Sequence, residues 1–312
     1  MRGTAERVIS GLRFSSFLER RHKRGTIYLT DLYNGKQIMQ KGAIGIFDSG
    51  YGGLTILRDI IKAMPEHDYI YLGDNARTPY GTRSFETVYK FTLQAVRKLF
   101  DMGCPLIILA CNTASAKALR TIQQNDLPKI APSNRILGVI RPTVEAIGNV
   151  TKSWEIGVMG TAGTIQSQSY DMEIKKLYPR ANVYGQACPM FVPIVENGEY
   201  DSPGADYFVE KYVNSLLAQS SAIDTVILGC THYPLLIEKI RGALPDGITV
   251  VPQGRLVAES LKDYLRRHPE IEERCLCSGK RFFYTTDSPE KFEASGKIFM
   301  GEAIKAEKIV LE

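Results

Sequence analysis

Apolar runs that alternate with amphipathic stretches are the feature of this sequence that most restricts its fold. Runs of β-branched and leucine residues recur from residue 43, and they are too continuous for a sheet with one wet face. Between them, apolar residues recur at steps of three and four, as at Leu54, Leu57, Ile61 and Met64. This alternation predicts parallel strands joined by right-handed helical crossovers, which is the doubly wound α/β class.

The pattern passes through two rounds that resemble each other loosely. Strands are expected at 43–50, 68–74, 105–111 and 136–140, then at 155–161, 182–188, 224–231 and 248–253. We predict two pseudo-symmetric doubly wound domains with largely parallel sheets and an active site in the cleft between them. Residues 42–138 plus 253–312 would form the first domain and residues 139–252 the second. RFFYTTD and the terminal KIVLE are expected to be edge strands that return to the first domain.

The positive charge of the chain is concentrated at its start. Residues 1–41 hold nine Lys or Arg and three Asp or Glu, a balance of +6, so the remaining residues sum to −1 within the total of +5. We expect this basic N-terminal extension to be a disordered or flexible tail, or to precede a true start at Met39. Basic tails bind nucleic acid or acidic lipid in some proteins. Composition gives no support to a nucleic-acid partner for the folded body.

The overall composition is that of an ordinary globular chain. Its 312 residues suffice for two domains, with 44% hydrophobic and 23% charged residues. No apolar run approaches the roughly 20 residues that a membrane span needs, and no secretion signal is evident. Six cysteines in a chain of this length do not suggest a disulfide framework. We therefore expect reduced thiols, no membrane partner and a cytoplasmic location.

Four polar residues stand where predicted strands end, namely Asp48, Asp74, Cys111 and Cys230. In open α/β sheets, ligands bind beyond the carboxyl ends of the strands, so both thiols are expected at a binding edge. Each cysteine is followed by small hydroxyl or amide residues of the kind that begin helices. The N–H groups of a helix N-terminus would attract a carboxylate and lower the pKa of the thiol.

Two such thiols suit one kind of chemistry. Two bases on opposite sides of a carbon can remove a proton from one face and return a proton to the other, which gives the mirror image of the substrate. One thiol must start ionised and the other protonated, and turnover exchanges these states. A pair of similar domains that face each other would provide the two half-sites.

Several motifs in order resemble those of bacterial glutamate racemase, in the aspartate/glutamate racemase superfamily. They are IGIFDSGYGGLTILRDI, YLGDNARTPYGTRS, LACNTASAKALR, GVIRPT, GVMGTAGTIQSQSY, CPMFVPIVENGEY and LGCTHYPLL. The resemblance implies an isomerase that interconverts L-glutamate and D-glutamate without pyridoxal phosphate or metal, and that supplies D-glutamate for peptidoglycan and hence for cell wall and cell shape. It also implies glutamate as the small-molecule substrate, a homodimer and, in some relatives, a cell-wall-precursor activator.

The same resemblance implies roles for individual residues. Cys111 matches the base that acts on D-glutamate, and Cys230 matches the base that acts on the L-enantiomer. Asp48 is implied to assist Cys111, while His232 and Glu196 are implied to assist Cys230. The implied substrate contacts are Asp48, Ser49, Tyr80, Gly81, Asn112, Thr113, Thr231 and His232, and no metal ligand is implied.

The remaining cysteines are expected to be structural. Cys104 and Cys188 each adjoin a proline and lack the polar residues that follow the other two, as buried structural thiols would. Cys275 and Cys277 form one C-x-C without a second pair or an adjoining histidine, which is weak support for a zinc site.

Three alternatives stay open. Racemisation of aspartate or another amino acid would use the same frame, since the residues do not measure a difference of one methylene. A non-catalytic protein that binds acidic amino acids would need only the two α/β lobes. A nucleic-acid-associated factor would depend on the basic extension. The chain also departs from many relatives at Gln253 and Gly254, where they have Asp-Ser-Gly or Asp-Pro.

Overall fold

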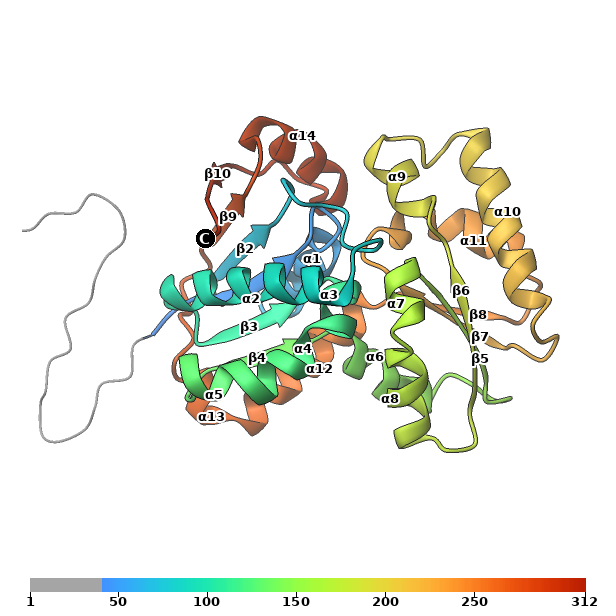
Figure 1. Ribbon diagram of the computed structural model, residues 1–312, viewed down its shortest axis with the longest axis horizontal. Coiled ribbons are helices and arrows are strands. Elements are labelled where there is room, and N and C mark those ends of the chain that lie inside the picture. The colour runs from blue at the N-terminus through green and yellow to red at the C-terminus, as the bar shows by residue number, and fades with distance from the viewer. Residues whose placement is uncertain (1–40) are drawn as a thin grey trace, which may run out of the picture. The chain divides into compact units, whose positions relative to one another are not determined.

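The computed structural model describes residues 41–312. The predicted basic extension therefore lies, apart from Lys41, outside the described residues. Within residues 41–312, no helix combines the length and the apolar composition that crossing a membrane requires. This part of the chain alternates strands with helices and builds two separate sheets (Figure 1).

The first sheet has six strands in the order β10-β9-β2-β1-β3-β4, and every neighbouring pair is parallel. Its strands are β1 (Ile44–Asp48), β2 (Tyr69–Gly73), β3 (Leu106–Leu109), β4 (Arg135–Gly138), β9 (Arg281–Thr285) and β10 (Ala306–Lys308). The register sets Asp48 beside Gly73 and Phe47 beside Leu109. Because β1 lies between β2 and β3, its carboxyl end opens near the middle of the sheet edge.

The C-terminal strands differ in part from the prediction. RFFYTTD contains β9, which pairs with β2 on one side and with β10 on the other, so it is an internal strand. The edge strand is β10, which ends at Lys308, where the KIVLE segment begins. The three-residue β10 covers the outer side of β9, and this is why β9 is internal.

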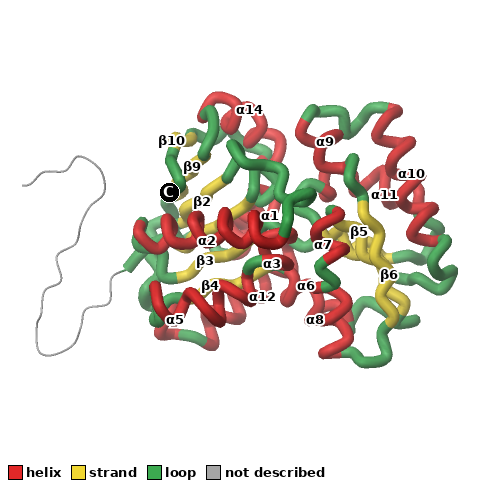
Figure 2. Tube along the Cα trace, in the orientation of Figure 1, coloured by secondary structure: helices red, strands yellow, loops and turns green. Residues whose placement is uncertain are grey.

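Alternate residues of the first sheet pack on opposite faces. On one face, Ile44 and Ile46 join a core with the helices α1 (Leu54–Ala63), α12 (Gly254–Arg267) and α14 (Pro289–Met300). On the other face, Phe47 joins a core with α2 (Phe85–Asp101). Both faces are covered by helices, as Figure 2 also shows, so the strands are apolar at nearly every position.

The second sheet has four parallel strands in the order β6-β5-β7-β8. They are β5 (Glu155–Gly160), β6 (Asn182–Ala187), β7 (Thr225–Gly229) and β8 (Thr249–Val251). The helices α6 (Ile140–Ile147) and α8 (Ser169–Leu177) share one apolar core with this sheet, while α10 (Pro203–Leu217) and α11 (Ile237–Ala243) share the other.

Shorter helices complete the connections. They are α3 (Asn112–Lys117), α4 (Leu119–Thr121), a π-helix (Ile122–Asp126), α5 (Leu127–Ile130), α7 (Ala162–Gln166), α9 (Phe191–Glu196), a 3₁₀ helix (Tyr233–Leu236) and α13 (Pro269–Glu272). The predicted fold class, two α/β sets with parallel sheets, is confirmed. We keep the domain boundaries as a proposal, supported by the end of β4 at Gly138 and the end of β8 at Val251.

Candidate active site

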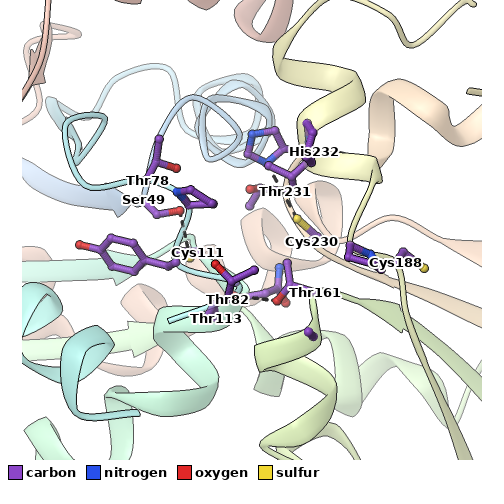
Figure 3. Close-up of a pocket in the computed structure, with 18 residues that line it drawn as sticks. Ser49, Thr78, Thr82, Cys111, Thr113, Thr161, Cys188, Cys230, Thr231 and His232 are labelled. Carbon is purple, nitrogen blue, oxygen red and sulfur yellow. Dashed lines mark hydrogen bonds between the residues drawn. The ribbon is translucent and has the colours of Figure 1, made fainter. Parts of the chain in front are cut away.

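One pocket collects most of the predicted site residues. It lies beyond the ends of β1, β3, β5 and β7, and Figure 3 shows Cys111 and Cys230 approaching it from opposite sides. Asp48 and Glu196 do not line it but lie behind residues that do. The lining residues are Ser49, Thr78, Pro79, Tyr80, Gly81, Thr82, Cys111, Asn112, Thr113, Thr161, Ala162, Cys188, Pro189, Val192, Pro193, Cys230, Thr231 and His232.

Cys111 follows β3 and caps the first turn of α3. Its sulfur accepts a hydrogen bond from the Ala114 backbone N–H at 3.5 Å and donates to Ser49 Oγ at 3.5 Å. The prediction that a helix start lowers the thiol pKa is wrong here. Burial raises the pKa of Cys111 to about 12 and the charge of Asp48 adds to the rise, while the bonds to Ser49 and Ala114 oppose it only in part. A neutral thiol therefore stands on this side of the pocket.

Asp48 ends β1 and is completely buried. Its Oδ2 accepts from the Gly50 backbone N–H at 3.0 Å, and its Oδ1 accepts from Thr231 Oγ1 at 3.5 Å. Burial raises the pKa of Asp48, although the charge of His232 and the N–H groups of Gly50 and Gly53 act against the rise. A carboxyl group whose pKa is shifted upward in this way is suited to exchanging a proton with a neighbour.

Cys230 has a different partner, the imidazole of His232. Nδ1 of His232 lies 3.9 Å from the Cys230 sulfur, and Nε2 lies 3.0 Å from Glu196 Oε1. Burial lowers the pKa of His232, but hydrogen bonds to Cys230 and Glu196, together with their charges, outweigh burial and raise it to about 10. Both ring nitrogens of His232 therefore face groups that stabilise the cationic form of the imidazole. The two thiols thus have opposite electrostatic surroundings.

The segment after Cys230 differs from the prediction of a helix N-terminus. His232 is followed by the 3₁₀ helix Tyr233–Leu236, and α11 begins only afterwards. Tyr233 is fully buried and its hydroxyl donates to the Cys188 carbonyl at 3.2 Å, which ties this tight turn to the neighbouring loop. An α-helix begins directly after Cys111, whereas the polar neighbour of the Cys230 sulfur is the His232 side chain.

Glycines allow loops from the two sheets to meet beside the pocket. A Cβ on Gly52 would lie 2.3 Å from Thr231 Oγ1 and 2.5 Å from His232 Nδ1. A Cβ on Gly81 would lie 2.7 Å from the Cβ of Thr161. The Gly81 carbonyl also accepts from the Gly163 backbone N–H at 2.8 Å. These positions exclude larger residues because the two lobes are already in contact there.

Tyr80 and Asp74 belong to one supporting cluster. The Tyr80 hydroxyl donates to Asp74 Oδ2, and Asp74 also pairs with Arg77 at 2.7 Å and accepts from Thr286 Oγ1 at 2.9 Å. Asp74, a predicted strand-end residue, therefore holds the loop that carries Tyr80 and does not line the pocket. Tyr80 itself lines the pocket, with its hydroxyl bonded to Asp74.

Thr161 and Cys188 are two of the lining residues that were not predicted from the sequence to belong to the site. Thr161 begins the first turn of α7 and its Oγ1 lies 3.0 Å from Thr113 Oγ1, so it joins the two lobes. Its position after the β5 strand, in GVMGTAGT, was the available signal. Cys188 was expected to be structural, and it is buried, with burial holding its pKa well above the ordinary range. It nevertheless lines the pocket as a third thiol.

Gln253 anchors the side chain of Asn112 from behind the pocket. Gln253 Oε1 accepts from Asn112 Nδ2 at 2.7 Å, and Asn112 Oδ1 accepts from the Tyr170 hydroxyl at 2.7 Å. Gln253 Nε2 donates to the Tyr170 hydroxyl at 2.6 Å and to Thr143 Oγ1 at 2.9 Å. The Thr143 hydroxyl donates to the Val139 carbonyl at 2.9 Å, so toward Gln253 it can only accept. The side-chain amide of Gln253 therefore has one orientation that satisfies all of these hydrogen bonds. Asn112 keeps one N–H available for the pocket that it lines.

Comparisons with known proteins agree with this geometry. A sequence model of the family described as Asp/Glu/Hydantoin racemase matches residues 53–261. The glutamate racemase of Jannaschia sp. (strain CCS1) is 40% identical over 279 residues, which cover 86% of this chain and 99% of that one. The chain belongs to the glutamate racemase family. It is therefore an amino-acid isomerase of the class that interconverts L-glutamate and D-glutamate.

Solved structures of glutamate racemases have the same fold. A glutamate racemase isoform of Bacillus anthracis superimposes with a TM-score of 0.79 at 35% identity, covering 86% of this chain and 98% of that chain. The glutamate racemase of Francisella tularensis, solved in complex with D-glutamate, gives a TM-score of 0.76 at 32% identity, covering 87% and 98%.

Replacement of Gln253 tests whether the network orients Asn112 in this family member. In Gln253→Met the amide of Asn112 loses the acceptor that fixes its orientation, so it presents its carbonyl oxygen to an anionic substrate part of the time. We expect kcat/KM for glutamate racemisation to fall about 10-fold, or ~1.4 kcal/mol, mainly through a higher KM. Circular dichroism of glutamate provides the rate.

The matched control is Thr143→Ala, which touches Gln253 but not Asn112. Gln253 Nε2 keeps its bond to Tyr170 in that variant, so KM should stay near the native value. Equal rises of KM in both variants would mean that the network acts only through stability.

Proposed function

We propose that the chain racemises glutamate by a two-base mechanism in which Cys111 and Cys230 act on opposite faces of the α-carbon. The observation that carries the proposal is the unequal environment of two thiols that line one pocket from opposite lobes. A two-base reaction needs one ionised and one protonated base at its start. The surroundings of Cys111 favour a thiol, and the cationic His232 favours negative charge on the Cys230 sulfur.

In the resting state that we propose, Cys230 is the thiolate and removes the α-proton of L-glutamate. The electron pair of the broken C–H bond remains on the α-carbon and its carboxylate. Cys111 then delivers its thiol proton to the opposite face, which gives D-glutamate with Cys111 ionised and Cys230 protonated. Cys111 is suited to be this donor because a thiol with a pKa of about 12 is fully protonated at neutral pH.

Reaction of D-glutamate needs the reverse charge state, in which Cys111 is the base. We propose that Asp48 assists it, because the charge of Asp48 acts on Cys111 and its own pKa is raised by burial. His232, backed by Glu196, serves Cys230 in the same way, since its Nδ1 is 3.9 Å from that sulfur. Each thiol then has its own partner for a proton: a carboxyl group in the first lobe and an imidazole in the second.

Removal of an α-proton places negative charge beside a carboxylate, so the pocket must stabilise it. We propose that side-chain and main-chain donors at Ser49, the Tyr80–Gly81 segment, Asn112, Thr113 and Thr231 hold the two carboxylates of glutamate. Their position in the lining supports this assignment. Preorganised donors typically contribute ~3–4 kcal/mol each to such a transition state. Asp48 lies behind the residues that line the pocket, so we assign it a role in proton transfer and not in direct contact with the substrate.

The biological setting rests on the family resemblance. We propose that the D-glutamate product is used in peptidoglycan synthesis, in the cytoplasm. A homodimer and a cell-wall-precursor activator stay predictions.

Removal of either catalytic thiol should abolish racemisation. General acid or base catalysis is worth about 10²–10⁴-fold, so we expect kcat to fall at least ~10³-fold in Cys111→Ala and in Cys230→Ala. In D₂O the native protein should replace the α-hydrogen with deuterium as it inverts the centre. The change is followed by mass spectrometry and chiral separation of glutamate.

Cys188→Ala is the control, because Cys188 lines the same pocket but has no part in the two-base scheme. It should retain racemisation within a few-fold of the native rate. The scheme is overturned if Cys111→Ala keeps native activity, or if Cys188→Ala loses as much activity as the two proposed bases.

The pKa of His232 predicts how the rate responds to alkaline pH. His232 has a pKa of about 10, so its cationic form is lost as the pH rises through that value, and kcat/KM should fall. Glu196 is one cause of the raised pKa, so Glu196→Gln should move the alkaline decline to lower pH. Titration of the substrate amino group is common to both proteins and cancels in the comparison. Superimposable pH profiles would contradict the role of the histidine.

A further inference from the structure

A second cluster of reactive side chains lies at the other edge of the first sheet. His67 precedes β2, Glu272 ends α13 and Cys277 precedes β9, so the cluster lies near the amino ends of strands of the first sheet, whereas the pocket lies beyond the carboxyl ends of that sheet's strands β1 and β3. One ligand atom from each, a ring nitrogen, a carboxylate oxygen and a sulfur, lies within 4.8 Å of the other two. No histidine adjoins Cys277 in the sequence, and the fold brings one there from a point 210 positions away.

The main chain around this cluster is held firmly. Asp68 accepts hydrogen bonds from the backbone N–H groups of Ser278 and Lys280 at 2.8 and 2.9 Å, and its own N–H donates to the Leu276 carbonyl at 2.8 Å. The Gly279 N–H donates to the Glu66 carbonyl at 2.9 Å. The segment that carries Cys277 is therefore fixed against the segment that carries His67 before any ligand arrives, as a specific binding site requires.

Two buried polar atoms of the cluster have no hydrogen-bond partner among residues 41–312. His67 has a side chain only 4% exposed, and its Nδ1 makes no hydrogen bond within residues 41–312, although Glu66 Oε1 lies 3.5 Å away. Its Nε2 lies 3.0 Å from Glu272 Oε1. The second carboxylate oxygen of Glu272 is buried and has no hydrogen-bond partner in the same part of the chain. Buried polar atoms without partners are uncommon in native proteins.

The cluster also carries an excess of negative charge. The carboxylates of Glu66 and Glu272 lie 3.5 and 3.0 Å from the ring nitrogens of His67, and the carboxylate of Asp68 accepts from the Ser278 N–H, next to Cys277. Three carboxylates beside a thiol create a potential that attracts a cation. The Cys277 side chain is exposed, so it is free to turn toward the two other ligand atoms.

We propose that His67, Glu272 and Cys277 bind a divalent transition-metal ion of the zinc type. Imidazole, carboxylate and thiolate are the three ligand classes of zinc, with bonds of about 2.0–2.3 Å. The ligand atoms, within 4.8 Å of one another, must move closer to share one ion, and the exposed Cys277 side chain has room to do so. Glu66 Oε1 lies 3.5 Å from the other ring nitrogen of His67, close to where the outer hydrogen-bond partner of a metal-bound histidine commonly stands. Magnesium and calcium are disfavoured because they prefer oxygen ligands.

Such an ion would join a loop near the start of the first sheet to the segment that leads into β9. It would therefore stabilise the fold without touching the reaction, because the pocket lies beyond the carboxyl ends of the strands and the cluster near their amino ends. This role is independent of the proposed racemase mechanism.

Cobalt(II) spectroscopy tests the site directly, because a thiolate ligand gives cobalt a charge-transfer absorption in the near ultraviolet. The host is the full chain with Cys111→Ser and Cys230→Ser, so that the two pocket thiols cannot bind the probe. We expect one equivalent of Co²⁺ to give the thiolate band, Zn²⁺ to displace it, and Cys277→Ser to remove it. Glu66→Gln should weaken Zn²⁺ binding about 10-fold.

Cys275→Ala is the matched control, since Cys275 is two residues away in the same C-x-C, is buried and donates to the Ile271 carbonyl at 3.4 Å. It should keep the band. A band that survives in Cys277→Ser, a band lost only in Cys275→Ala, or no band in the host would overturn the proposal. Because Cys277 is exposed, its replacement should not disturb folding, which the unfolding temperature without metal checks.

Stability gives a second readout in the protein with its native pocket. Zn²⁺ should raise the unfolding temperature of the native chain and not that of Cys277→Ser, because an ion that binds only the folded state stabilises it. Racemisation by metal-free Cys277→Ser should equal that of the metal-free native protein. An equal rise of unfolding temperature in both proteins would place the ion elsewhere and refute the assignment.

Discussion

The imidazole of His232 is buried between a sulfur and a carboxylate, 3.9 Å from Cys230 and 3.0 Å from Glu196. Burial opposes its positive charge, and the two partners together overcome burial. On the other side of the pocket, burial and the charge of Asp48 keep the thiol of Cys111 protonated. Burial favours the uncharged form of both side chains. The neighbours differ: the charge of Asp48 adds to the effect of burial on Cys111, whereas the partners of His232 overcome it.

The contact between the two lobes makes this arrangement possible. Gly52 lies so close to Thr231 and His232 that no side chain fits there, and Thr55 Oγ1 donates to the Thr231 carbonyl at 3.1 Å. Gly81 is equally close to Thr161. These contacts bury the side chains at the strand ends, and hydrogen bonds and charges act more strongly among buried groups than in water. The packing of the two lobes thus also sets the electrostatic environment of the two thiols.

Much of this could be predicted from the sequence because it depends on local patterns. Continuous apolar runs predicted the parallel strands. The positions of Cys111 and Cys230 at the ends of two such runs predicted that both thiols lie at the carboxyl ends of strands. The raised pKa of Cys111 could not be predicted, since it arises from burial by segments far along the chain. The bond between Asn112 and Gln253 likewise joins residues 141 positions apart, and only the fold brings them together. The prediction of an α-helix directly after Cys230 was wrong because Tyr233 packs into a tight 3₁₀ turn.

The most direct test of the central claim measures the charge on each sulfur of the free protein at neutral pH. Thiolates absorb in the ultraviolet where thiols do not, so the native spectrum can be compared with those of Cys111→Ser and Cys230→Ser. The account predicts that Cys230→Ser loses the absorbance of one thiolate and that Cys111→Ser loses none. Equal losses from both variants, or a loss only when Cys111 is replaced, would contradict it.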